Sequence, residues 1–193
     1  MHPSTENKIN LAVIGAGLVS DYHHVPGIRL DPRARLVAVC DTDEALLEKR
    51  KLDWQVDKVT SNPEEIFSDE GVDGVIIATP NASHGRLASE CLARGVPVLV
   101  EKPISDLLES AHDIVTASDQ AGVPVLVGHH RRHSTAVRRT KQLLENHAIG
   151  ELIALSLMWA LKKPDDYFDV DWRSRPPGGG PVLINLCLLY TSD

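Results

Sequence analysis

A glycine-rich turn follows the first apolar run of the chain and has the residue types of a phosphate-binding loop. Residues 9–14 are mainly apolar, and the hexapeptide Gly-Ala-Gly-Leu-Val-Ser comes directly after them. Its first glycine permits a tight turn, and its second lets backbone N–H groups approach a pyrophosphate at a helix N-terminus. Ser20 replaces the third glycine, which serves helix packing and tolerates a small residue. The residues expected to hold a dinucleotide are Gly15, Ala16, Gly17, Leu18 and Val19.

An acidic residue follows the second apolar run at the spacing that a ribose-binding carboxylate needs. Asp41 comes 21 residues after Ser20. A carboxylate here can accept hydrogen bonds from both ribose hydroxyls and would repel a 2′-phosphate. The spacing therefore predicts NAD rather than NADP as the cofactor. The alternative, an ordinary glycine turn and an unrelated surface aspartate, is disfavoured by the strand, turn and helix around the motif.

Two further polar segments, residues 79–84 and 101–103, end apolar runs and should reach the same crevice, because ligands bind beyond the carboxyl ends of parallel strands. Asn81 and His84 are candidates to contact the nicotinamide half of the cofactor. The alternative is that Asn81 caps the next helix and His84 lies in its first turn. Lys102 can donate to a substrate oxygen and help to move its proton, or it can be a surface lysine in a turn.

The elements that must position these residues follow from alternating apolar and amphipathic stretches. Short apolar runs predict buried strands at 9–14, 35–40, 74–78, 96–100 and 124–127. Amphipathic stretches predict helices at 43–52, 83–93, 105–121 and 135–146, with Ser105 as a cap and Gly95 and Gly122 as stops. Such alternation predicts an α/β fold with a doubly wound parallel sheet.

Composition excludes several classes of function. The 193 residues are 42% hydrophobic and 24% charged, with a formal net charge of −7. The acidic balance and scattered basic residues argue against nucleic acid as a partner. Three distant cysteines without a Cys-x-x-Cys pair predict neither disulfides nor a zinc site. The polar N-terminus and the lack of a long apolar run predict a cytoplasmic protein without a membrane partner.

The organisation of the chain changes after the fifth apolar run. We expect a nucleotide-binding domain at 1–130 and the start of a second domain at 131–186. Residues 151–161 alternate between apolar and polar, which predicts an antiparallel strand with one covered face. Residues 187–193 can be back-translated into the transposon-end adapter of sequencing libraries. We therefore expect a non-native tail and a truncated chain; the alternative is a genuine strand at 182–190.

In combination, the motifs resemble the Gfo/Idh/MocA family over residues 8 to about 186. The resemblance rests on the fingerprint, Asp41, Thr-Pro-Asn-x-x-His, Glu-Lys-Pro, a Gly-x-x-Arg-Arg segment, Trp172-Arg173 and the glycine run 178–180. It implies a Rossmann domain followed by an α/β domain whose mixed sheet mediates homo-oligomers. It also implies an NAD(P)-dependent oxidoreductase of sugars or polyols with Lys102 as the catalytic residue. The further cofactor-binding residues expected are Thr79, Pro80, Asn81, His84, Glu101, Lys102 and Arg131.

Three departures from the family pattern bear on function. The family often has Gly-Phe-Asn-Arg-Arg-Phe where this chain has three histidines at 129, 130 and 133. No carboxylate or cysteine accompanies them at ligand spacing, so no metal site is expected, and Arg131 should face the crevice. The family's aspartate and histidine fall on Ile184 and Leu188. Finally, the sequence stops where the resemblance implies that most of the second domain should begin, so we expect a truncated chain that is inactive by itself.

Two other functions stay open at this point. The first is an NAD-dependent glycoside hydrolase, a type that occurs in the same family. The second is an NAD-binding protein without catalytic activity, which could be regulatory. Net turnover of NAD would separate a dehydrogenase from both.

Overall fold

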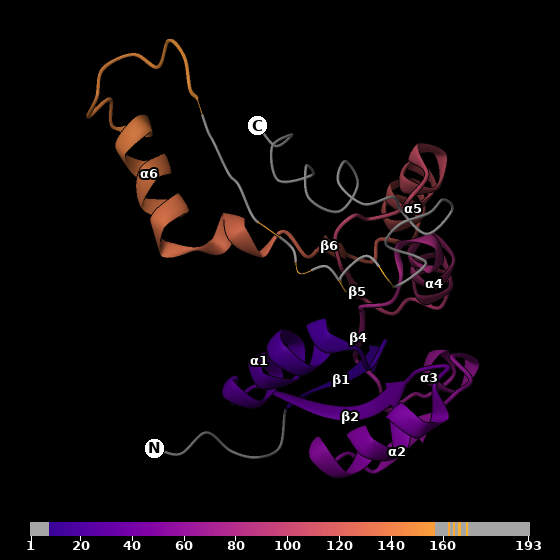
Figure 1. Ribbon diagram of the computed structural model, residues 1–193. Coiled ribbons are helices and arrows are strands. Elements are labelled where there is room, and N and C mark those ends of the chain that lie inside the picture. Colours follow the sequence, from indigo (N-terminus) through magenta and orange to yellow (C-terminus); the bar gives the residue numbers. More distant parts are fainter. Residues whose placement is uncertain (1–7, 157–161, 163, 165, 167–168, 170–193) are drawn as a thin grey trace.

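A single parallel sheet organises the chain. The computed structural model describes residues 8–156, 162, 164, 166 and 169. Within them, six strands follow the order β3-β2-β1-β4-β5-β6, and helices flank the sheet (Figure 1). The chain builds outward from β1 in one direction and then from β4 in the other. This is the doubly wound Rossmann arrangement expected from the sequence.

The five predicted strands are confirmed with small changes in their bounds. They are β1 (Ile9–Ile14), β2 (Ala34–Cys40), β4 (Gly74–Ile77), β5 (Val98–Val100) and β6 (Val125–Val127). The sequence analysis missed β3 (Lys58–Thr60), which pairs in parallel with β2. Only three residues long and opened by a lysine, β3 gives no detectable periodicity.

The predicted helices are also confirmed, with a correction at one cap. They are α2 (Glu44–Asp53), α4 (His84–Ala93), α5 (Leu108–Ala121) and α6 (Thr135–Glu145). The fingerprint leads into the π-helical turn η1 (Ser20–His24) and then α1 (Val25–Leu30). Gly95 and Gly122 end their helices with φ of +74° and +64°. Ser105 was expected to cap α5, but the helix begins later and Ser105 accepts instead from the N–H of Leu107 at 3.3 Å.

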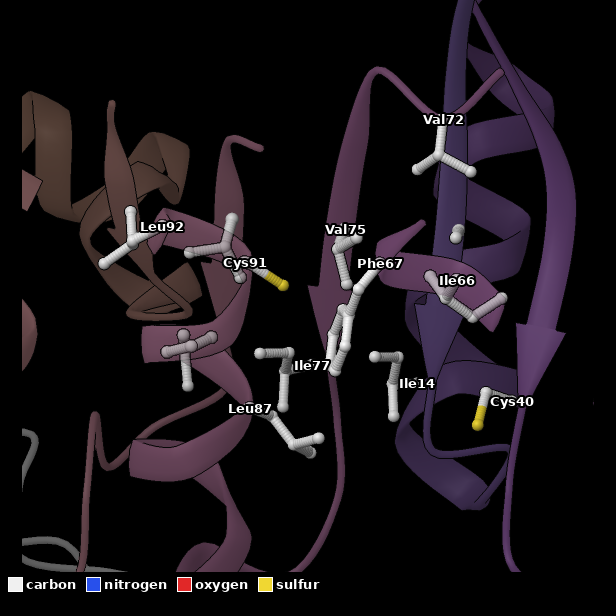
Figure 2. Packing of buried hydrophobic residues seen from close by; sticks show 14 of the residues in the cluster. Ile14, Cys40, Ile66, Phe67, Val72, Val75, Ile77, Leu87, Cys91 and Leu92 are labelled. Carbon is white, nitrogen blue, oxygen red and sulfur yellow. The ribbon is translucent and has the colours of Figure 1, made fainter. Parts of the chain in front are cut away.

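The core fills both faces of the sheet. One face of the strands contacts α1 and α2 through Val13, Val25 and Leu47. The other contacts α4 and the short helix α3 (Glu64–Phe67), and Figure 2 shows Phe67, Ile77 and Leu87 in this layer. Such close packing on both sides explains why the strands are nearly all apolar.

Two of the three cysteines take part in this packing. Cys40 and Cys91 are free and buried. Burial raises the pKa of the Cys40 thiol to about 11 and that of Cys91 to about 12. Both thiols are therefore protonated at neutral pH, which makes them poor nucleophiles and metal ligands.

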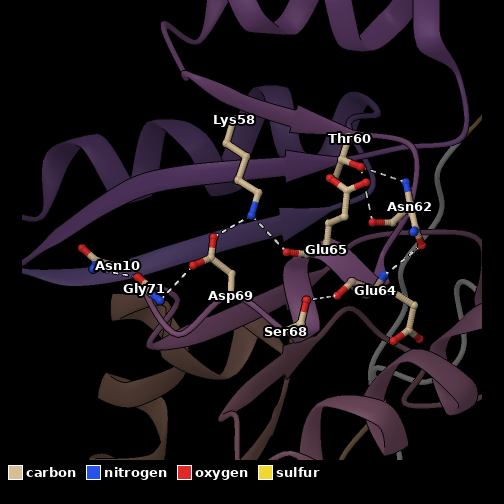
Figure 3. Close-up of polar contacts among 9 residues, drawn as sticks. All are labelled: Asn10, Lys58, Thr60, Asn62, Glu64, Glu65, Ser68, Asp69 and Gly71. Atoms are coloured by element: carbon tan, nitrogen blue, oxygen red, sulfur yellow. Dashed lines mark hydrogen bonds and ion pairs between the residues drawn. The ribbon is translucent and has the colours of Figure 1, made fainter.

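Polar contacts fasten the edge strand β3 to α3. The Nζ of Lys58 donates to the Asp69 carboxylate at 2.7 Å and to the Glu65 carbonyl at 3.0 Å (Figure 3). The Thr60 hydroxyl accepts from the N–H of Asn62 at 3.0 Å. Lys58 thus has a structural role at the edge of the sheet, where charged residues also discourage strand addition.

The part of the chain after β6 departs from the sheet. Helix α6 projects away from the sheet (Figure 1), and it contains no buried residue. The strand predicted at 151–161 is wrong over 151–156, which are exposed and form no strand. The physical reason is that a strand requires a hydrogen-bonding neighbour, and no described residue provides one. Within the described ranges, no helix is both long and apolar enough to span a membrane.

Candidate functional site

The glycine turn lies at the switch point between β1 and β4, where the two halves of the sheet diverge. Gly15 has a φ of +101°, and a Cβ there would lie 2.4 Å from the Ala78 carbonyl oxygen. Only glycine allows this conformation and this approach of the β1 turn to the end of β4. The predicted fingerprint therefore lies where doubly wound sheets bind their ligands.

The backbone N–H and the backbone carbonyl of Ala16 both form hydrogen bonds with side chains. The Ala16 N–H donates to Asp41 Oδ2 at 2.6 Å, while its carbonyl accepts from Arg50 Nε at 3.1 Å. Asp41 Oδ1 accepts from the N–H of Asp43 at 3.0 Å. Asp41 thus orders the loop and the start of α2. Because each carboxylate oxygen can accept more than one hydrogen bond, these contacts leave acceptor capacity for a ligand.

Sequence reasoning missed Arg50, which binds the glycine loop through the Ala16 carbonyl. Its side chain is 8% exposed and lies 2.9 Å from the Asp21 carboxylate. It also lies over the Trp54 ring at 5.0 Å, and Trp54 Nε1 donates to Asp21 at 2.9 Å. The signal in the sequence was an Arg and a Trp four residues apart, which places them on one helix face.

The open side of the turn fits the phosphates of a dinucleotide. A Cβ on Gly17 would meet no atom within 4 Å, so the space in front of this backbone is clear. Leu18 and Val19 follow and are 57% and 42% exposed. The first N–H groups of a helical segment have no intrahelical acceptors, and they attract anions. Ser20 is buried and its hydroxyl donates to the Gly15 carbonyl, so it closes the turn from the inner side.

The segment after β4 enters the crevice through a short 3-10 turn, η2 (Asn81–Ser83). Asn81 is buried, and Ser83 rather than Asn81 occupies the N-cap of α4. The Ser83 hydroxyl donates to Thr79 Oγ1 at 2.7 Å. A hydrogen bond inside the segment therefore stabilises the turn of Thr79 and Pro80.

His84 is fully buried, and its ring lies between two backbone carbonyls. Nε2 is 2.8 Å from the Thr79 oxygen, and Nδ1 is 2.7 Å from the Pro103 oxygen. The ring thus joins the segment after β4 to the segment after β5. This geometry favours a role in positioning the Thr79 and Pro103 segments over direct contact between the His84 ring and a cofactor.

Glu101, Lys102 and Pro103 follow β5 on the same edge of the sheet. The Glu101 carboxylate contacts His24 Nε2 at 3.0 Å and accepts from the N–H of Lys102 at 3.2 Å. Burial would raise the pKa of Glu101, but the hydrogen bond and charge of His24, with those of Lys102, lower it below its usual value. His24 is the second residue that sequence reasoning missed.

Three histidines follow β6 at the same edge of the sheet. Burial and the charge of Arg132 lower the pKa of His129. The ring of His130 stacks on that of His23 from η1, with centroids 6.4 Å apart. Arg131 is exposed in the turn η3 (His130–His133). In the described part of the chain, no three acidic, histidine or cysteine side chains converge as metal ligands.

Several sequence predictions lie outside the described residues. These are Trp172-Arg173, the glycine run at 178–180, Ile184, Leu188, the strand at 182–190 and the tail at 187–193. The division into domains likewise stays a prediction.

Comparisons with known proteins agree with this geometry. A family profile described as "Oxidoreductase family, NAD-binding Rossmann fold" (GFO_IDH_MocA) matches residues 9–129. The match begins at β1 and ends two residues after β6, so it covers the whole sheet.

The chain is similar to curated dehydrogenases and reductases. It is 30% identical over 148 residues to scyllo-inositol 2-dehydrogenase (NAD(+)) of Bacillus subtilis, covering 77% of this chain and 43% of that protein. It is 32% identical over 132 residues to 1,5-anhydro-D-fructose reductase of Ensifer adhaerens, covering 68% and 39%. The chain thus spans less than half the length of these relatives.

A solved structure resembles a larger part of the chain. The WlbA dehydrogenase of Bordetella pertussis, in complex with NADH and UDP-GlcNAcA, superposes with a TM-score of 0.84 at 26% identity. The superposition covers 97% of this chain and 54% of that one.

Proposed function

The chain belongs to the Gfo/Idh/MocA oxidoreductase family, and we propose that it is the cofactor-binding part of an NAD-dependent oxidoreductase of sugars, polyols or related secondary alcohols. The observation that carries the proposal is that the glycine turn, Asp41 and Lys102 follow the carboxyl ends of β1, β2 and β5 at one edge of the parallel sheet, with β4 between β1 and β5. The substrate class is supported by the relatives, which are named for inositol and anhydrofructose.

Each part of the crevice has a distinct task in this proposal. The N–H groups around Gly17 would bind the pyrophosphate, and Asp41 would accept from the ribose hydroxyls. The bound nicotinamide would supply hydride chemistry at a carbinol or carbonyl carbon. Lys102 would donate to the oxygen on that carbon and assist its proton transfer.

The preference for NAD is tested by titrating NAD⁺ and NADP⁺ against this chain and against Asp41→Ala. We expect the unmodified chain to bind NAD⁺ more tightly, because the carboxylate would repel a 2′-phosphate. Loss of the ribose hydrogen bonds should cost about 1.5–3 kcal/mol, or about 10- to 150-fold in Kd.

A matched control is Asp43→Asn, which removes the same charge two residues away. An asparagine can still accept from the N–H of Leu46, as Asp43 does at 2.9 Å, so the cap of α2 is kept. We expect this variant to bind NAD⁺ like the unmodified chain. Equal affinities for NAD⁺ and NADP⁺ in the unmodified chain would contradict the role of Asp41.

A further inference from the structure

A partly buried pair links two segments that are far apart in the sequence. His24 ends η1, the turn that follows the glycine loop, and Glu101 follows β5. Their side chains are only 14% and 15% exposed, and His24 Nε2 lies 3.0 Å from Glu101 Oε1. The contact spans 77 residues. It therefore ties the helical segment behind the phosphate site to the segment that contains the candidate catalytic lysine.

The Glu101 carboxylate is enclosed by three elements. Its second oxygen, Oε2, accepts from the main-chain N–H of Lys102 at 3.2 Å. At the end of β6, a Cβ on Gly128 would lie 2.9 Å from Oε1 and 3.1 Å from Oε2. A side chain at position 128 would therefore collide with the carboxylate. Glycine at this position lets Glu101 lie between His24 and the N–H of Lys102.

The charges around Glu101 favour its ionised form. The groups that face it are His24 from η1, Lys102 from its own segment and His129 from the end of β6. Arg132 lies near His129 and adds positive charge there. A carboxylate in this basic surrounding accepts stronger hydrogen bonds than a neutral acid would.

We propose that His24 is a positioning residue for Lys102, which it holds in place through the Glu101 carboxylate. Neither His24 nor Glu101 needs to touch a ligand in this arrangement. The inference rests on the proposed function, because it assumes that Lys102 acts at the nicotinamide end of the crevice. The family resemblance led us to expect that Glu101 binds the cofactor. In this proposal Glu101 instead links His24 to Lys102.

Two substitutions of His24 distinguish a hydrogen-bonding role of its ring from a role in packing alone. His24→Gln keeps an N–H donor at about the reach of Nε2, whereas His24→Leu has no donor. His23→Leu is the matched control, because His23 is the neighbouring histidine, is exposed and stacks on His130 instead. A role limited to packing would make the Gln and Leu variants alike.

The readout is the Lys102 amide, followed by NMR in the ¹⁵N-labelled 193-residue chain without cofactor. We expect His24→Leu to speed hydrogen exchange at this amide about tenfold, the change for one weakened charge-assisted hydrogen bond. His24→Gln should stay within about twofold of the unmodified chain, and so should His23→Leu.

Unchanged exchange in His24→Leu, or equal acceleration in His24→Gln, would overturn the inference. If His24→Leu does not fold, His24→Ala takes its place, because alanine also lacks a donor, and exchange as slow as in His24→Gln would then overturn the inference. Addition of NAD⁺ separates this inference from the proposed function. Failure of the unmodified chain to bind NAD⁺ would contradict the proposed function, while the exchange data would still judge the link between His24 and Lys102.

Discussion

Residues 8–129 and residues 130–156 differ in how their sequence patterns become structure. In the first region, strands and helices bury each other, and the buried hydrophobic side chains extend from Ala12 to Ile114. In the second, α6 forms with a local cap in which the Ser134 side chain accepts from the N–H of Val137 at 3.2 Å, yet none of its residues is buried. A helix completes its hydrogen bonds within itself, whereas a core requires partners from elsewhere in the chain.

The largest effect that we expect concerns Lys102, which lies in the first region. In a longer chain that includes the residues after this segment, Lys102→Ala should lower turnover about 10²- to 10⁴-fold, the usual contribution of a general acid or base. The Kd for NAD⁺ should change little. Steady-state NADH formation and cofactor titration measure the two quantities. Near-normal turnover would remove Lys102 from the mechanism, and release of sugar without net NADH would favour a hydrolase.

The comparison of the two regions is tested directly by one truncation in each. Ile66 is only 1% exposed, so Ile66→Ala leaves a cavity in the core and should lower the free energy of unfolding by about 2–5 kcal/mol. Val137→Ala on α6, at 46% exposure, should change it by less than about 0.5 kcal/mol. Urea unfolding measures both. Similar losses would show that α6 is part of the cooperative core.

Ion pairs should also contribute more to the free energy of unfolding in residues 8–129 than in residues 130–156. Arg50→Met leaves Asp21 and the Ala16 carbonyl without this donor and should cost about 1–3 kcal/mol. Lys141→Met removes an exposed pair with Glu145 at 3.9 Å and should cost less than about 0.5 kcal/mol. Thermal unfolding ranks the two variants. An Arg50→Met chain as stable as the Lys141→Met chain would mean that the buried network adds no stability.

The smallest effect is expected at two glycines with positive φ. Gly122 and Gly150 have φ of +64° and +80°, and a Cβ on either would meet no atom within 4 Å. The cost of alanine is therefore conformational, about 1 kcal/mol for Gly122, which ends a helix of the core. Gly150→Ala should leave the global unfolding free energy unchanged within about 0.3 kcal/mol, because we expect its region, which contains no buried residue, to open independently. Equal costs by urea titration would contradict that independence.

The sequence by itself determined the elements whose signals are local. Apolar runs located five strands, and glycines at 95 and 122 marked helix ends that the structure confirms. The fingerprint and Asp41 indicated the cofactor crevice, because a tight turn and an acid at the end of the next strand are constraints of a few neighbouring residues. The family profile agrees with this interpretation.

Only the tertiary structure decided which distant side chains meet. The contacts of Arg50 with the Ala16 carbonyl, of His24 with Glu101 and of the His84 ring with the Pro103 carbonyl join residues 19 to 77 positions apart. Strand β3 exists because β2 supplies its hydrogen bonds, and residues 151–156 form no strand because no described residue does so for them. Helices and turns are stabilised by contacts within one segment, so a sequence pattern reveals them. Strand pairing and buried polar contacts need a partner whose position depends on the whole fold.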